Sequence, residues 1–297
     1  MNIISKAWRV RTKSVFVATI ILALFAFVYT EAQEVVQIEP AKTRLIITPG
    51  NSQAGTINIS NHSKESKNVK VYLEDWVYLP VCDGTKDFRP AGTANLSAAP
   101  WISFVPSEFT IAAFGKRTLN YTVRVPLEAK GGHYAVLFFE NYLGEQNPSS
   151  EGVSVNLAVR IASLFYIEPK GTINRQARIA GLKIIKDQGK FYISVNFTNI
   201  GNVDITAKAN FFIIDEKGMA YARGEFNEVY TFPRDSATLS SSWRETIPKG
   251  KYDLILTVDI SKALKEAGLG EVPPAITKEA QIEIGDNGEV IMVGELR

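Results

Sequence analysis

The sequence predicts an all-β protein with two tandem immunoglobulin-like β-sandwich domains behind an N-terminal signal peptide. Short runs of alternating apolar and polar residues recur about every ten residues, and turn residues such as Pro49-Gly50 and Gly131-Gly132 stand between them. Alternation with period two is the pattern of strands with one buried face. About seven such runs are typical of an immunoglobulin-like sandwich. The chain contains two such sets, one on each side of Pro169.

Residues 1–32 have the layout of a secretory signal peptide. Basic residues between Lys6 and Lys13 precede the apolar run Val15–Tyr29, and Thr30–Ala32 offers small residues where a signal peptidase cuts. The apolar run is shorter than the roughly 20 residues of a membrane span. Export with cleavage is therefore the main prediction, and a retained N-terminal membrane anchor is the alternative.

Charge and cysteine content argue against a nucleic-acid partner and against an intramolecular disulfide. Without residues 1–32 the net charge changes from +2 to −1, because four basic residues and Glu31 are lost. No basic field then remains to attract nucleic acid. Cys82 is the only cysteine, so an intramolecular disulfide cannot form. We expect stability to come from burial of apolar side chains.

The first predicted sandwich spans residues 33–169. Its apolar stretch Tyr134–Phe139 has the composition of a central strand, and Leu79–Ser97, rich in proline and glycine, is expected to be an inserted loop. The expected strands are the alternating runs Arg44–Thr48, Gly55–Asn61, Asn68–Tyr78, Glu108–Ala112, Arg117–Val125, Gly132–Glu140 and Gly152–Tyr166.

A polar linker is predicted over residues 170–177 and a second sandwich over 178–285. Ser261–Gly268 is the one segment for which a helix is expected. The tail, residues 286–297, is expected to be either mobile or an extra edge strand. The linker composition is compatible with a fixed angle between the domains and with free hinging.

Catalytic and metal-binding patterns are not evident in the sequence. The two histidines, His62 and His133, lie in a polar turn and after a glycine pair, with no candidate nucleophile or thiolate at a suggestive spacing. There is also no glycine-rich phosphate loop. We therefore predict a protein that is not an enzyme and that uses no cofactor, metal or small-molecule substrate.

The alternating residues Val153, Val155, Leu157 and Val159 allow two interpretations. They line the core if their strand lies inside a sheet. If the strand lies at an edge, its backbone and alternate side chains are available to a partner strand. Exposed edges are normally suppressed because they aggregate, so an edge kept open is expected to have a use.

Four segments carry a resemblance to a known family. They are TRLIITPGNSQAGTINISN, WISFVPSEFTIAAFGKRTLNYTVRVP, HYAVLFFE and VSVNLAVRIASLFYIEP, in this order over residues 35–169. In these segments the chain resembles the N-terminal domain of the periplasmic pilus chaperones of the chaperone–usher pathway. The second domain resembles generic secreted immunoglobulin-like modules, and the chain also resembles the two-domain WxL-interacting surface proteins of Gram-positive walls.

The resemblance implies a mechanism and a set of partner-binding residues. Val153, Val155 and Leu157 would donate a strand to an incomplete pilin-like subunit, and Arg44 would anchor the subunit's terminal carboxylate. The family usually has a lysine where this chain has Ala162-Ser163, and Arg160 is the candidate replacement. The implied partners are pilin-like or other secreted β-rich subunits and an outer-membrane usher, in the periplasm.

A second function remains open from the sequence. The sandwiches could belong to a structural or adhesive protein, anchored in the inner membrane or placed at the cell surface, that binds a wall polymer or another surface protein. A carbohydrate-binding or enzyme-accessory module is a third class, although the sequence shows no row of exposed aromatic residues for it.

Overall fold

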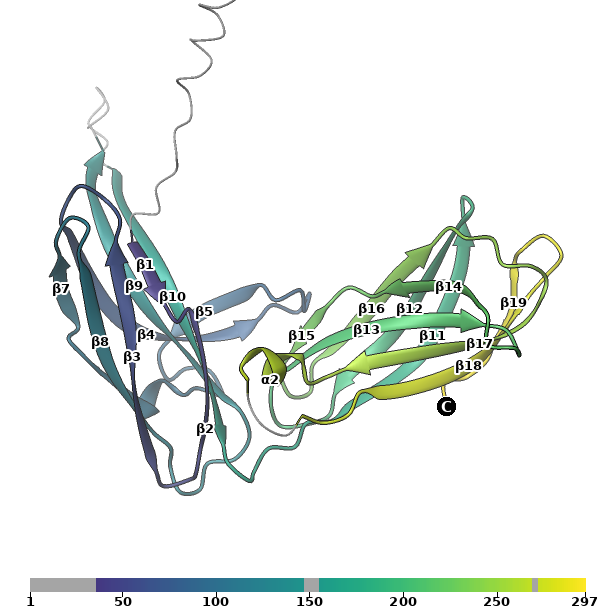
Figure 1. Cartoon of the computed structure of the whole chain (residues 1–297). Coiled ribbons are helices and arrows are strands. Elements are labelled where there is room, and N and C mark those ends of the chain that lie inside the picture. The colour runs from purple at the N-terminus through teal and green to yellow at the C-terminus, as the bar shows by residue number, and fades with distance from the viewer. Residues whose placement is uncertain (1–35, 147–154, 269–271) are drawn as a thin grey trace, which may run out of the picture.

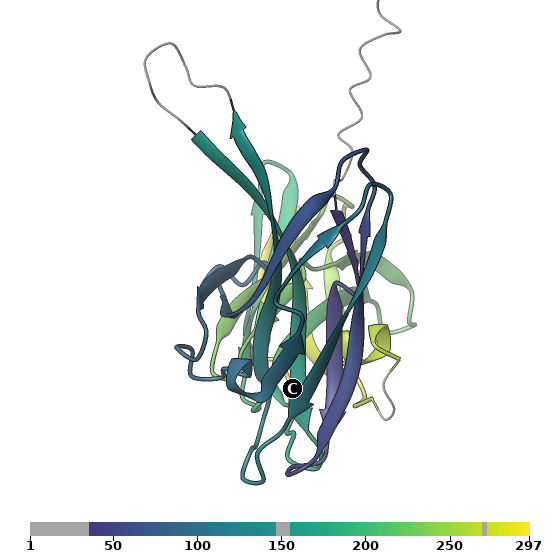
Figure 2. The ribbon, with the colours of Figure 1, turned by 90° about the vertical axis from the view of Figure 1, so that its left-hand side faces the viewer.

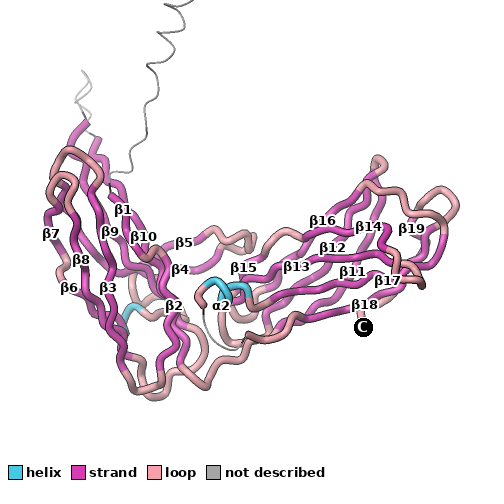
Figure 3. Tube along the Cα trace, in the orientation of Figure 1, coloured by secondary structure: helices cyan, strands magenta, loops and turns pink. Residues whose placement is uncertain are grey.

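The computed structural model describes residues 36–146, 155–268 and 272–297, and the predicted signal peptide lies outside these ranges. The predicted all-β class with two tandem sandwiches is confirmed: strands form nearly all of the regular structure (Figure 3). Among the described residues, no helix is long and apolar enough to cross a membrane, and no group of three acidic, cysteine or histidine side chains is placed to hold a metal ion.

The first sandwich packs two sheets against each other. One has the strand order β1 (Val36–Glu39), β3 (Ser52–Asn61), β8 (Lys116–Arg124), β6 (Ile102–Val105). The other has the order β2 (Lys42–Ile47), β10 (Val155–Pro169), β9 (His133–Gln146), β4 (Lys67–Tyr78), β5 (Lys86–Pro90), with β7 (Glu108–Ile111) also paired to β4. A 3-10 turn, η1 (Ala99–Trp101), leads into β6.

Strand β9 is central and is buried on both faces, as its continuous apolar run predicts. Leu137 and Phe139 point into the core of the first sandwich, whereas Val136 and Phe138 point to the opposite face. The opposite face would be solvated in an isolated sandwich. Here it belongs to a second apolar cluster that includes Phe232 of the second sandwich.

The second sandwich has the same two-layer design. One sheet is β11 (Ala177–Asp187), β12 (Lys190–Asn199), β16 (Ser236–Trp243). The other is β14 (Ala220–Glu225), β13 (Ile205–Ile214), β17 (Gly250–Asp259), β18 (Ile276–Ile284), β19 (Val290–Val293), with β15 (Val229–Thr231) also paired to β13. The expected helix is α2 (Lys262–Glu266), and the tail supplies an edge strand, β19.

One segment differs from the sequence prediction. The segment predicted as an inserted loop, Leu79–Ser97, contains β5, which continues β4 as a hairpin. The hairpin tip reaches the second sandwich, where the backbone N–H of Tyr230 donates to the carbonyl of Cys82 at 2.9 Å. Figure 1 shows the β4–β5 hairpin extending from the first sandwich to the second. The insertion is therefore an interdomain brace.

Candidate functional site

The β9–β10 hairpin forms an arm with one open edge. β10 pairs with β9 from Val155 to Ile167, but it pairs with β2 only from Leu164 to Pro169. Between Val155 and Ser163, therefore, no strand of the described chain pairs with the second side of β10. Figure 2 shows the two strands running out past the rest of the sandwich.

The edge is open because the N-terminal segment, residues 36–47, passes from one sheet to the other beside it. β1 pairs with β3 in the opposite sheet, and the chain crosses over before β2 begins at Lys42. At the crossing, Ser163 Oγ donates to the Pro40 carbonyl at 2.8 Å, and Leu164 N–H donates to the Ala41 carbonyl at 2.9 Å. Pairing with β2 then starts, so the open segment ends at Ser163.

The open segment keeps the alternation that the sequence predicts. Phe165 and Ile167 are buried in the core, and Ile161 packs against it from the same face. Val159 shares that face but is 45% exposed, because the sandwich opens at this level. Of the three predicted donor residues, Val155 and Leu157 lie in β10 at the same parity, and Val153 lies outside the described residues.

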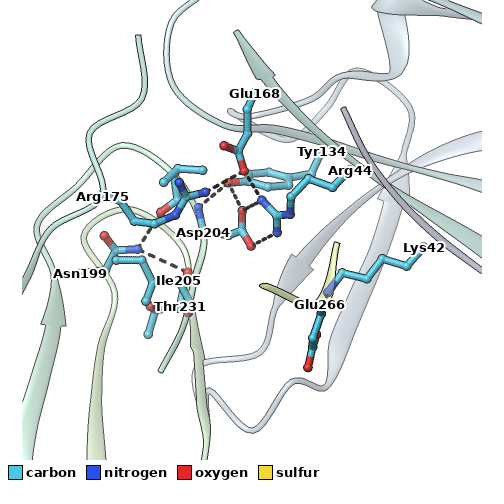
Figure 4. A network of polar contacts seen from close by, with 11 residues as sticks. Lys42, Arg44, Tyr134, Glu168, Arg175, Asn199, Asp204, Ile205, Thr231 and Glu266 are labelled. Atoms are coloured by element: carbon cyan, nitrogen blue, oxygen red, sulfur yellow. Dashed lines mark hydrogen bonds and ion pairs between the residues drawn. The ribbon is translucent and has the colours of Figure 1, made fainter. Parts of the chain in front are cut away.

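Arg44 lies on the other face of the same sheet, buried between the two sandwiches. Its guanidinium makes two hydrogen bonds to the Asp204 carboxylate, at 3.0 and 2.7 Å, and a further one to Glu168. Both the Arg44 and the Asp204 side chains are 1% exposed. Asp204 belongs to the second sandwich, so the predicted anchor for a partner's carboxylate is paired here with carboxylates of the chain itself (Figure 4).

Two further side chains complete this interdomain ion network. Arg175, from the segment between the sandwiches, donates to Glu168 at 2.7 Å. The Tyr134 hydroxyl donates to Asp204 Oδ1 at 3.2 Å and accepts from its backbone N–H at 2.6 Å. The network thus holds two guanidinium groups and two carboxylates, and their charges balance.

The network shifts the pKa of Asp204, Arg44 and Tyr134. Burial alone would raise the pKa of Asp204, but the charge and hydrogen bonds of Arg44 outweigh it, and the pKa is lowered. Burial would lower the pKa of Arg44, and Asp204 and Glu168 raise it instead. Burial raises the pKa of Tyr134 well above its ordinary value. All three groups therefore stay in their ordinary charge states at neutral pH.

An aromatic cluster lies beside the network and joins the same two sandwiches. Phe232 stacks on Tyr134 with 4.4 Å between ring centroids, and it contacts Trp76 and Tyr78 at 5.2 and 4.8 Å. Trp76 is therefore part of the interface between the sandwiches, where it is 1% exposed. Aromatic pairs at these separations add to the stabilisation from buried area.

Further hydrogen bonds join the two sandwiches beside the segment that connects them. Gly132 N–H donates to the Asn202 carbonyl at 2.8 Å, and the Asn202 side chain donates to the carbonyl of Thr172. Gly131 has a φ of +76°, and a Cβ at this position would lie 2.6 Å from the Asn202 oxygen. These contacts favour the fixed angle over free hinging, the two linker behaviours that the sequence leaves open.

Arg160 lies on the same face of the sheet as Arg44 but far along the strand. Its guanidinium bonds Glu74 at 3.3 Å and lies 4.3 Å from the Phe138 ring. Arg44 pairs with Tyr166, six positions from Arg160, which corresponds to about 20 Å of strand. The structure therefore does not bring these two cations together, and one carboxylate cannot contact both.

Lys42 is a cation that the sequence interpretation missed. It occupies the same face of β2 as Arg44, its ammonium lies 4.9 Å from the Tyr166 ring centroid, and its side chain is 41% exposed. Glu266 of α2 lies 4.0 Å away. Burial and the nearby charge of Arg44 lower the pKa of Lys42. The sequence could have revealed Lys42, because residues two apart in a strand lie on the same face, and Lys42 is two residues before Arg44.

Comparison with known proteins yields structural neighbours only. No family model and no curated protein matches the sequence. Among solved structures, the class 5 fimbriae chaperone CfaA is 16% identical, with 82% of this chain and 98% of that chain covered and a TM-score of 0.46. A chain of the chaperone–tip adhesin complex of CFA/I fimbriae is 14% identical, with 82% and 97% covered and a TM-score of 0.46.

A third neighbour comes from the complex of the Salmonella enterica SafA pilin with the SafB chaperone. It is 14% identical, with 82% of this chain and 94% of that chain covered and a TM-score of 0.38. These neighbours are of the class that the sequence resembles, the chaperones of fimbriae. Because identities are low and the TM-scores are below 0.5, nothing about the function of this chain follows from them.

Proposed function

We propose that the protein is a periplasmic chaperone of the pilus type that binds secreted β-rich subunits by strand donation. The observation that carries the proposal is the open edge of β10 between Val155 and Ser163, where the backbone pairs with β9 alone among the described strands. An edge of this length offers a partner about half of its backbone hydrogen-bonding groups, and Val159 stands exposed beside it.

In this proposal a subunit pairs with β10 and covers the face that carries Val159 and Ile161. The subunit's backbone then completes the sheet, and pockets in its own unfinished core take the alternate side chains of β10. No cofactor is required, because the free energy comes from strand pairing and apolar burial in the partner. The fixed interdomain interface holds the arm and the second sandwich in one orientation.

Anchoring of the subunit's terminal carboxylate by Arg44 requires an exchange. Asp204 and Glu168 already bond its Nη atoms, so an incoming carboxylate has to replace Asp204. Lys42 lies on the same face two residues before Arg44, and its side chain is partly exposed, as is that of Glu266, the carboxylate 4.0 Å from its ammonium. A partner's carboxylate can therefore approach Lys42 without displacing Asp204 from Arg44. We therefore expect Lys42→Ala to weaken subunit binding more than Arg160→Ala does.

The test compares capture of periplasmic proteins by variants that differ at one exposed apolar residue. Val159→Glu places a charge on the open strand, and Phe212→Glu does so at a similarly exposed position of β13, a strand paired on both sides. We expect the wild type and Phe212→Glu to recover small β-rich subunits, and Val159→Glu and Leu157→Glu to lose them. Circular dichroism checks that all variants fold.

Two outcomes would count against strand donation. Equal recovery of the same subunits by all variants would show that binding does not use the β10 edge. Recovery of wall polymer or of a surface protein by all of them would instead support the structural or adhesive class.

A further inference from the structure

We propose that Asn141 is a specificity-determining residue, which selects partners that carry a glutamine side chain beside the open edge of β10. The proposal rests on strand donation by β10. It starts from Asn141 on β9, which is 3% exposed and whose amide oxygen and nitrogen both lack a hydrogen-bond partner. Buried side-chain polar atoms normally have partners, so an amide with none calls for an explanation.

Asn141 interrupts an otherwise apolar row of side chains. The row crosses four strands through Phe109, Val69, Asn141 and Val159, which are register partners in turn. The next row inward, Val71–Phe139–Ile161, is entirely apolar. The polar residue therefore stands in the row where the sandwich begins to open.

Between Asn141 and the open edge this row changes from buried to exposed. Val69 is 2% exposed, Asn141 3% and Val159 45%. A strand added to β10 lies two strand spacings from β9, or about 10 Å. A long amide side chain on that strand, reaching over Val159 toward Asn141, can close this gap. Two amides can form a pair of hydrogen bonds, which satisfies both the oxygen and the nitrogen.

A second buried asparagine shows how a side-chain amide is hydrogen-bonded when it stabilises the protein without a partner. Asn61, in the same sandwich, is 1% exposed and donates to the carbonyls of Glu65 and Ala112 at 2.7 and 3.0 Å. Its oxygen accepts the N–H of Ser63. Asn61 is a structural amide with its bonds made, and it is the matched control for Asn141.

The first arm of the test measures thermal stability of the purified protein without a partner. Leucine has nearly the shape of asparagine but no polar atoms. We expect Asn141→Leu to raise the melting temperature by about 2–4 °C, because an unsatisfied buried amide is removed, and Asn61→Leu to lower it. An equal loss in both variants would overturn the proposal, since the Asn141 amide would then be satisfied in the free protein.

The second arm measures binding of synthetic nine-residue peptides of alternating valine and threonine with lysines at both ends. Each valine in turn is replaced by glutamine, and fluorescence anisotropy gives the affinity. For one position we expect wild type to prefer glutamine over valine about fivefold to tenfold, and Asn141→Leu to lose this preference.

The outcomes separate the two proposals. Peptides that bind wild type and Asn141→Leu with the same preferences would overturn the role of Asn141 and leave strand donation standing. A failure of all peptides to bind wild type would overturn both. Self-association of Asn141→Leu with unchanged peptide preference would show that the amide guards the edge against aggregation, which also contradicts the proposal.

Discussion

Removal of the Asp204 carboxylate is expected to uncouple the two sandwiches. In Asp204→Ala, Arg44 loses two of its hydrogen bonds, Tyr134 loses its acceptor, and one positive charge in the network is left unbalanced. Breaking a buried ion pair by removing one partner costs about 3–5 kcal/mol. Because both side chains are 1% exposed, screening by solvent does not reduce this figure.

Differential scanning calorimetry measures the effect. At 2–4 °C for each kcal/mol, the loss corresponds to a fall in melting temperature of about 6–20 °C, with separate transitions for the two sandwiches. The control is Asp286→Ala, which removes a partner of Lys249 in an ion pair with 64% and 76% exposed side chains. Such exposed pairs contribute within about 1 kcal/mol.

The pH dependence gives a second signature of the same network. The pKa of Asp204 is lower in the folded protein than its ordinary value of 3.8. Its contribution to stability is therefore fully present above pH 3.8 and is lost as the pH falls through the folded pKa. The stability difference between wild type and Asp204→Asn should be constant from pH 7 to pH 5 and shrink below pH 3.8. A variant that melts like wild type, or a difference that vanishes already near pH 6, would refute this account.

Further predictions concern the same interface. Phe232→Ala should cost about 3–5 kcal/mol in chemical denaturation, whereas Phe114→Ala, at an exposed position, should cost less than about 0.5 kcal/mol; equal costs would contradict the aromatic cluster's role. Gly131→Ala should lower the melting temperature more than Gly92→Ala does, because both have positive φ but only Gly131 faces a close carbonyl; the reverse order would show that the junction of the two sandwiches is not tightly packed.

Local patterns in the sequence predicted the fold class and the candidate strand β10. Alternation predicts β8 and β10, because each strand buries one face, and the apolar run Tyr134–Phe139 predicts a central strand. The same alternation could not decide whether β10 lies at an edge. The open edge depends on where the chain passes from one sheet to the other around Pro40. No periodic pattern in the sequence marks that crossing.

The interdomain contacts lay beyond local reasoning for a different reason. Arg44 and Asp204 are 160 positions apart, and neither has a neighbour pattern that marks the other as its partner. Arg160 was predicted as a replacement for the family's lysine, but strand parity fixes only the face of the sheet and not a distance along it. Lys42 shares that parity and is two residues from Arg44, so it was within reach of the sequence.

The central claim is that β10 keeps an open edge that a partner strand closes, and hydrogen exchange of its backbone amides tests it most directly. In the free protein, about half of the amides between Val155 and Ser163 should exchange fast and the others, bonded to β9, slowly. Addition of a captured subunit should slow the fast set. Unchanged exchange in this segment, with the subunit bound, would contradict strand donation.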